Sequence, residues 1–158
     1  MKRLRYQNSD LDRIDSAILE LLIEDARTSV AELARRVELS APSVSERIRR
    51  LEEAGVIRGY TLDIDPTAIG LLLTVWIRIR PLPGALGRVA EILQARPEIV
   101  ECDRITGDDC YVARAHVADV AALEILIDAF ADCASTNTSV VQSSPVARRL
   151  PPVVGGPG

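Results

Sequence analysis

The chain has 158 residues, of which 47% are hydrophobic and 27% charged, so it is long enough for one compact domain or two small ones and has the composition of a folded protein. The longest apolar-leaning run, residues 68–77, is too short to span a bilayer, and residues 1–9 are polar and basic, so no membrane anchor or export signal is predicted. The three cysteines lack CxxC spacing, which makes a disulfide framework or a thiolate metal site unexpected. We therefore expect a cytoplasmic protein.

The formal net charge of −4 is unevenly distributed along the chain. Residues 1–60 carry 11 Lys and Arg against 11 Asp and Glu, and residues 61–158 carry 8 against 12, which together give the −4. Within the first part, residues 35–50 hold five arginines against two glutamates, a local net charge of +3. A basic face on a near-neutral module is the footprint expected for a polyanionic partner.

Two short amphipathic helices are predicted first. Apolar residues at spacings of three and four predict a helix over residues 12–25, with Asp10 or Asp12 as its N-cap. Residues 29–32, SVAE, match a capping box and predict a second helix that ends near Arg36.

A third helix is predicted over residues 40–54. Ser40 is its expected N-cap, Pro42 lies in the first turn, where a missing N–H is tolerated, and Gly55 is the expected C-terminal stop. The narrow face that should pack on the first two helices carries Val44, Ile48 and Leu51.

The opposite face of the third helix is polar, with small hydroxyls near its N-terminus and arginines further on. The second and third helices are joined by a short turn, and the third exposes this polar face. This layout matches the helix-turn-helix, whose second helix enters the major groove of DNA. An ordinary solvated face with a Glu46–Arg50 pair is the alternative. We expect Ser43, Ser45, Glu46 and Arg49 to approach base edges, and Arg47 and Arg50 to hold phosphates. The candidate DNA-binding residues are Pro42, Ser43, Ser45, Glu46, Arg47, Arg49 and Arg50.

The second half alternates strands and helices. Period-2 and period-3.6 patterns, with turn residues between them, predict six elements in the order strand, helix, strand, strand, helix, strand, which is the ferredoxin-like split unit. The turn at residues 107–110 should close a hairpin. The predicted ranges are 72–80, 85–95, 99–106, 111–117, 119–132 and 136–143.

Few residues suit catalysis or metal binding. The single histidine, His116, lies in an alternating strand-like run, and without a second ligand or a nucleophile it is best interpreted as a half-buried strand residue. Gly84 and Gly87 form only a GxxG, which is too weak a pattern for a nucleotide site. We predict no enzymatic activity, no cofactor and no metal.

Both halves resemble one known family. LDRIDSAILELLIEDAR and AELARRVELSAPSVSERIRRLEEAGVIRGYTLDIDPTAIG are similar to the N-terminal module of the Lrp/AsnC, or feast/famine, transcription regulators. PEIVECDRITGDDCYVARAHVADVAALEILIDAF and TNTSVVQSSPV resemble the family's C-terminal effector and assembly domain. The resemblance implies a regulator that binds double-stranded DNA, responds to an amino acid and builds dimers into octamers.

The predicted fold class is therefore α+β, with a three-helix helix-turn-helix domain joined by a strand-like hinge to a ferredoxin-like βαββαβ domain. The expected boundaries are a basic N-terminus at 1–9, the DNA-binding domain at 10–58, the hinge at 59–70, the effector-binding and oligomerisation domain at 71–149 and a tail at 150–158.

One sheet face of such a domain has no helix to cover it. Trp76 should lie on that face, and a two-fold homodimer is the simplest way to bury it, although it could pack inside its own subunit instead. Two recognition helices related by a two-fold axis would read a pseudo-palindromic site.

An effector site is expected at the turn that contains Asp108 and Asp109. A free amino acid needs an acceptor for its ammonium and several donors for its carboxylate, and this turn offers carboxylates and backbone N–H groups. An acidic hairpin chosen only for turn formation is the alternative. Many family members carry an aromatic residue and then aspartate where this chain has Asp109 and Cys110, which leaves the ligand open; apolar neighbours favour an apolar or aromatic amino acid. The candidate residues are Thr106, Gly107, Asp108, Asp109, Thr136 and Thr138.

Two other functions remain open. One is an architectural protein that compacts DNA with little sequence preference and without a ligand. The other is an enzyme like the tetrapyrrole decarboxylases that resemble this family, which would need substrate-binding histidines or arginines inside.

Overall fold

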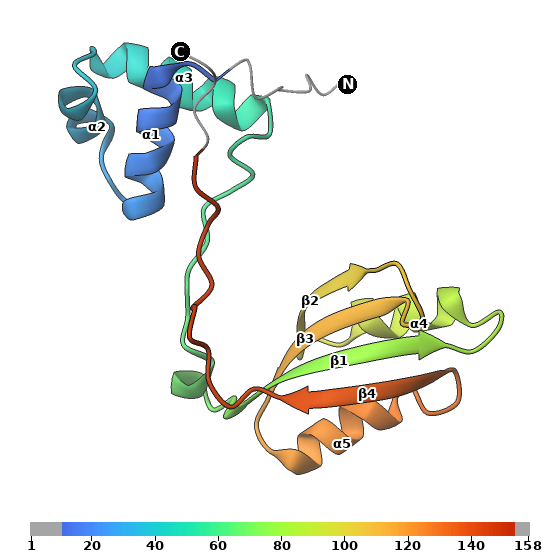
Figure 1. The fold of residues 1–158 in the computed structure, drawn as a ribbon. Helices are drawn as coiled ribbons and strands as arrows, with labels where there is room; N and C mark the ends of the chain where they lie inside the picture. The colour runs from blue at the N-terminus through green and yellow to red at the C-terminus, as the bar shows by residue number, and fades with distance from the viewer. Residues whose placement is uncertain (1–10, 154–158) are drawn as a thin grey trace. The chain divides into compact units, whose positions relative to one another are not determined.

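The computed structural model describes residues 11–153, so the predicted N-terminal segment 1–9 and the last five residues of the tail lie outside the described part. The chain forms two compact units, a helix unit and a sheet unit (Figure 1). Among the described residues, the helix unit comprises 11–62 and 148–153, and the sheet unit comprises 63–147. Residues 148–153 thus group with the helices, whereas the sequence placed the start of the tail at residue 150.

The helix unit contains three helices that begin where their caps predict. The Asp12 side chain accepts hydrogen bonds from the backbone N–H groups of Ile14 and Asp15, and Ser40 accepts one from Ser43. Only half of the predicted capping box is formed: Ser29 accepts from the Glu32 N–H, but the Glu32 carboxylate accepts from Arg35. The helices are α1 (Arg13–Glu24), α2 (Val30–Arg36) and α3 (Ala41–Glu53).

A small apolar core holds these helices together. As predicted, Val44 and Leu51 of α3 are fully buried and Ile48 packs against the core from one side. The turn between α2 and α3 passes through Glu38, whose φ of 56° lies in the left-handed region. The buried members of the core cluster are Ile18, Leu33, Ala34 and Val44.

The segment between α3 and the sheet was expected to be strand-like. Residues 59–65 belong to no sheet within the described part of the chain, because the four strands of the sheet unit pair only with one another there. Pro66 then opens the 3-10 helix η2 (Pro66–Ile69), which Asp65 caps through the Thr67 N–H and which ends at Gly70 with a φ of 86°.

The sheet unit has the predicted order of elements. Its four strands form an antiparallel sheet in the order β2-β3-β1-β4, and both helices cover the same face (Figure 1). The elements are β1 (Leu73–Pro81), α4 (Leu86–Ala95), β2 (Ile99–Arg104), β3 (Tyr111–Val117), α5 (Val120–Asp128) and β4 (Ala134–Val140).

Three predicted boundaries, in two elements, were wrong by two to four residues. Helix α5 ends at Asp128 rather than near residue 132, because the following turns bury Phe130 completely beneath the sheet. Strand β4 starts at Ala134 and ends at Val140, the span over which it pairs with β1.

The alternation predicted for β1 is confirmed. Val75, Ile77 and Ile79 are fully buried on the helix-covered face, together with apolar residues of β3 and both helices. The residues between them, Trp76, Arg78 and Arg80, lie on the opposite face, which we call the open face of the sheet.

Candidate functional site

The outer side of α3 presents most of the residues that the sequence singled out for DNA. Among these, Pro42, Ser43 and Ser45 are exposed, and the hydroxyls of Ser40 and Ser43 lie 2.8 Å apart. Arg50 is also exposed, whereas Arg47 is not. The helix therefore offers small polar groups in its first turns and charged groups further along.

Arg49 lies between two glutamates on the outer side of α3. Its Nε is 2.8 Å from Glu46 Oε2, its Nη2 is 2.5 Å from Glu46 Oε1, and its Nη1 donates to Glu53. These hydrogen bonds raise the pKa of Arg49, and the same guanidinium lowers the pKa of Glu46. All three side chains are more than half exposed, so the ion pairs contribute little to stability and can be exchanged for other partners.

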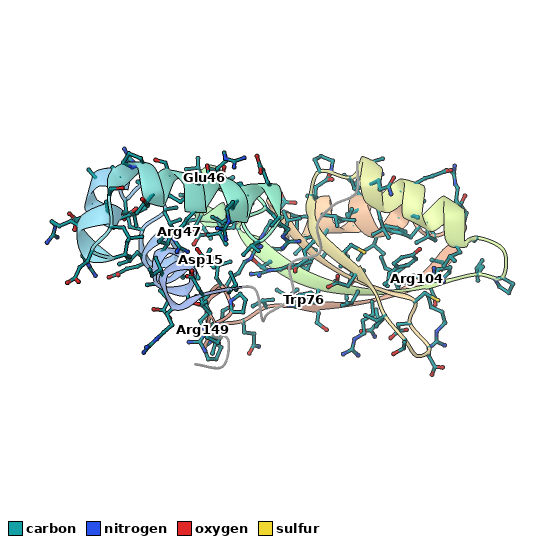
Figure 2. The ribbon with its side chains drawn as sticks, turned by 90° about the horizontal axis from the view of Figure 1, so that it is seen from above. Asp15, Glu46, Arg47, Trp76, Arg104 and Arg149 are labelled. Carbon is teal, nitrogen blue, oxygen red and sulfur yellow. The ribbon has the colours of Figure 1, made fainter. Side chains whose placement is uncertain are left out.

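Arg47 points inward instead. Its Nη1 donates to Asp12 Oδ2 at 2.6 Å and to Asp15 Oδ1 at 2.7 Å, which ties the middle of α3 to the start of α1 (Figure 2). The Asp15 side chain is only 1% exposed, and the Arg47 side chain is 22% exposed. Arg50 Nη2 approaches the other oxygen of Asp15 at 3.9 Å.

Sequence reasoning missed this pair, although one signal could have found it. Asp15 falls among the apolar residues of α1, next to Ile14 and three residues before Ile18. A carboxylate in that position needs a cationic partner from a neighbouring helix, since an unpaired buried charge is costly. Burial alone would raise the pKa of Asp12, but the Asp15 backbone N–H and Arg47 outweigh it and hold that pKa below its usual value.

A polar depression of about 320 Å³ lies in the sheet unit. Of the six candidate effector residues, Asp109 and Thr136 line it. Arg80 connects this depression to the hairpin: its Nε donates to the Asp108 carbonyl at 3.0 Å, and its Nη2 lies 3.5 Å from Asp109 Oδ1 and 3.8 Å from Asp108 Oδ2. The lining residues are Arg78, Arg80, Asp109, Ser135, Thr136 and Asn137.

The other four candidates do not line this depression, and Asp108 is linked to it only through its contacts with Arg80. Thr106 and Gly107 are exposed at the tip of the hairpin and do not line it. Thr138 stands opposite Ile77 in the register of β4 with β1, on the helix-covered face, and its hydroxyl is buried without a hydrogen-bond partner.

The open face also carries an aromatic and basic group. Trp76 is 39% exposed, and the Arg114 guanidinium lies 5.8 Å from the centre of its ring. His116 Nδ1 is 2.9 Å from the Thr74 hydroxyl, which fits the half-buried strand histidine that the sequence predicted. Burial, with a contribution from Arg114, lowers the pKa of His116.

Residues 11–153 offer neither a metal site nor a membrane-spanning helix. That part of the chain contains no cluster of His, Cys, Asp and Glu side chains that could hold a metal ion. Its helices are also too short or too polar to cross a membrane.

Comparison with known protein families covers both units. A family model described as "Winged helix-turn-helix DNA-binding" matches residues 11–58, and one described as "Lrp/AsnC ligand binding domain" matches residues 74–151. The HTH-type transcriptional regulator LrpC of Bacillus subtilis is 37% identical over 133 residues, which cover 84% of this chain and 92% of LrpC. The chain belongs to the Lrp/AsnC family of transcriptional regulators.

Other members of the family agree with this assignment. The leucine-responsive regulatory protein of Escherichia coli is 39% identical over 121 residues, 75% of this chain and 74% of that protein. The structure of B. subtilis LrpC superposes with a TM-score of 0.83 at 36% identity, covering 87% of this chain and 99% of LrpC. A transcriptional regulator from Neisseria meningitidis, solved as a complex with L-Met, has a TM-score of 0.83 at 28% identity and covers 89% of this chain and 96% of its own.

Proposed function

We propose that this Lrp/AsnC regulator reads DNA with the outer side of α3 and that an amino acid bound at the polar depression changes its DNA binding or its assembly. The observation that carries the first part is the helix-turn-helix geometry: α3 is held on α1 and α2 by its apolar face and directs exposed hydroxyl and charged side chains outward. Such a helix fits the major groove, where side chains can reach base edges.

Within this face, we assign different roles to neighbouring residues. Ser43, Ser45, Glu46 and Arg49 are assigned to base edges, and a glutamate there can accept from cytosine N4–H. Arg49 can exchange its exposed glutamates for a guanine edge at little cost, because exposed ion pairs are worth only about 0–1 kcal/mol. Arg50 is assigned to a phosphate.

Salt-dependent binding to DNA tests these roles. Arg50→Ala should weaken binding to all sequences and reduce the slope of log K against log salt by about 0.9 for one lost phosphate contact. Arg49→Ala should change the preference among sequences. Arg27→Ala is the matched control, because Arg27 is an exposed arginine of the same unit outside α3. Unchanged low-salt affinity in both α3 variants would show that another surface reads DNA.

The open face of the sheet is our candidate for assembly. Trp76 and the Arg114 side chain over it are covered by no helix of this unit, and burying them against the same groups of a second copy gives a two-fold dimer. Two copies of α3 would then read a pseudo-palindrome, and dimers could build a larger ring such as an octamer. Trp76→Glu should shift the protein toward monomer and weaken DNA binding, whereas light scattering that finds an intact oligomer would remove this assignment.

Amino-acid control is supported by the matched ligand-binding domain and by the relative bound to L-Met. In this chain, Asp109 offers an acceptor for the ligand ammonium, and Arg78, Arg80 and the Ser135 hydroxyl offer donors for a carboxylate. Footprinting on promoter and random DNA, with and without amino acids, distinguishes this function from ligand-free DNA compaction. Equal protection of both DNAs, unaffected by any amino acid, would favour the compacting protein.

A further inference from the structure

The register of the sheet brings together polar groups that are far apart in the sequence. Arg78 and Arg80 of β1 both lie on the open face. Their partners on β4 are Asn137 and Ser135. The hairpin between β2 and β3 adds Asp109 beside them. On the open face, the lining therefore offers two guanidiniums, one carboxylate, one hydroxyl group and an amide, whereas Thr136 stands opposite Ile79 of the helix-covered face.

The two arginines have different surroundings. Arg80 is already bound to the hairpin through the Asp108 carbonyl and the Asp109 carboxylate. Arg78 has no ion pair and no hydrogen bond from its side chain to any residue in the described range 11–153. Strand residues two apart lie roughly 7 Å from each other, so the two positive charges repel one another and together favour an anion between or above them.

The charges of the lining indicate the charge of the ligand. Arg78 and Arg80 contribute +2 and Asp109 contributes −1, which leaves +1; the Asp108 side chain does not line the depression and is 92% exposed. A neutral amino acid supplies one ammonium and one carboxylate and would leave one guanidinium without a partner. An acidic amino acid supplies one ammonium and two carboxylates, a net charge of −1, which balances the lining.

The lining does not favour the class of ligand that the sequence suggested. An apolar or aromatic amino acid was expected because Ile105, Cys110, Tyr111 and Val112 flank the hairpin, but none of them lines the depression. Tyr111 is buried in the core of the unit. An apolar side chain would therefore meet only charged and polar groups, which gain nothing from its burial.

We propose that the depression binds an acidic amino acid such as glutamate or aspartate, with Arg78 pairing the side-chain carboxylate and Asp109 the ammonium. This inference rests on the proposed role of the depression as the effector site and adds the class of effector and the residue that selects it. Arg78 acts as the specificity-determining residue, because it is the group that a neutral amino acid would leave unpaired.

Glutamate and glutamine have the same shape and differ in one charge, so calorimetry on the full chain with both ligands isolates the contribution of Arg78. Wild type should bind glutamate, or aspartate, at least about tenfold more tightly than the matching amide or L-methionine, a difference of about 1.4 kcal/mol. Arg78→Gln should bring the ratio between acid and amide close to one. Arg88→Gln, which changes an exposed arginine at a different depression of the same unit, should leave the ratio unchanged.

The possible outcomes are distinguishable. Tight binding of L-methionine or glutamine together with weak binding of both acids would overturn the acidic class and leave amino-acid control intact. Absence of binding by every amino acid tested would overturn both. Equal binding of glutamate and 2-oxoglutarate, which lacks the ammonium, would remove the role of Asp109. The ligand preference of wild type decides the class even if Arg78→Gln fails to fold.

Discussion

Replacing Arg47 by alanine should destabilise the helix unit by about 3 kcal/mol. The Asp15 carboxylate is 1% exposed and is hydrogen-bonded to the Arg47 guanidinium, so the variant leaves a charge where water hardly reaches. Removing one member of a buried pair costs roughly 3–5 kcal/mol, and the partial exposure of Arg47 and Asp12, 22% and 50%, puts this pair at the lower end.

The stability of the helix unit should also depend on pH through Asp12, the second carboxylate bound by Arg47. The pKa of Asp12 is lowered, because hydrogen bonds from the Asp15 N–H and from Arg47 outweigh the opposing effect of burial. A lowered carboxyl pKa contributes stability that is present above the unfolded value, 3.8, and is lost as the pH falls through the folded value. Arg47→Ala should remove part of this acid dependence.

Urea denaturation separates the two units. Trp76, the single tryptophan, lies in β1 and reports on the sheet unit, whereas far-ultraviolet circular dichroism also follows α1, α2 and α3. Arg47→Ala should shift the helical transition and leave the Trp76 transition unchanged. Arg49→Ala, whose ion pairs are exposed, should change stability by less than about 1 kcal/mol.

The opposite pattern would refute this reasoning. If Arg47→Ala changes stability by less than about 1 kcal/mol and instead lowers the salt slope of DNA binding by about 0.9, then Arg47 contacts a phosphate, as the sequence suggested. A double variant, Asp15→Leu with Arg47→Met, adds a second test, because a well-packed apolar pair should recover most of the lost stability.

Three further predictions concern single positions. Glu38→Gly should stabilise the helix unit by up to about 1 kcal/mol and raise its melting temperature, because φ is 56° at this position and glycine adopts this angle without strain. A lower melting temperature would contradict this. The sheet unit should lose stability as the pH falls below the usual histidine pKa of 6.5, because burial and Arg114 lower the pKa of His116, and a histidine with a lowered pKa favours the fold only while it is neutral; Trp76 fluorescence should show this step in wild type and not in His116→Gln. Phe130→Ala should destabilise the sheet unit by about 3–5 kcal/mol in the same assay, while the exposed Val120→Ala should cost less than 1 kcal/mol, on the order of a surface change; similar losses in both would place Phe130 outside the core.

Local signals predicted the helices and strands well. Asp12, Ser29 and Ser40 cap the three N-terminal helices because a side-chain oxygen next to free N–H groups stabilises a helix start whatever the rest of the fold does. The alternation of β1 predicted which of its residues face the core, since one buried face imposes a period of two.

The contacts that build the sites depend on register and could not be predicted in the same way. Thr138 was assigned to the effector site, but a shift of one residue along β4 moves a side chain to the other face, and its pairing with Ile77 directs it toward the helices. The alternation of β1 puts Arg78 on the same face as Trp76, yet its neighbours Asn137 and Asp109 come from a distant strand and a hairpin. Arg47 was expected to hold a phosphate, but the direction of its side chain depends on Asp15 of another helix.

The small core of the helix unit has a consequence for how long each copy of the regulator survives. Among residues 11–153, its cluster contains four buried residues against fourteen in the sheet unit, so the described helices rely on few apolar contacts. Bound DNA stabilises the folded helices by mass action, by about 2.7 kcal/mol at a hundred times the dissociation constant. Because proteolysis follows the population of opened chains, copies on their operators should be degraded more slowly than free copies. Occupied promoters would then keep their regulator after its synthesis has stopped.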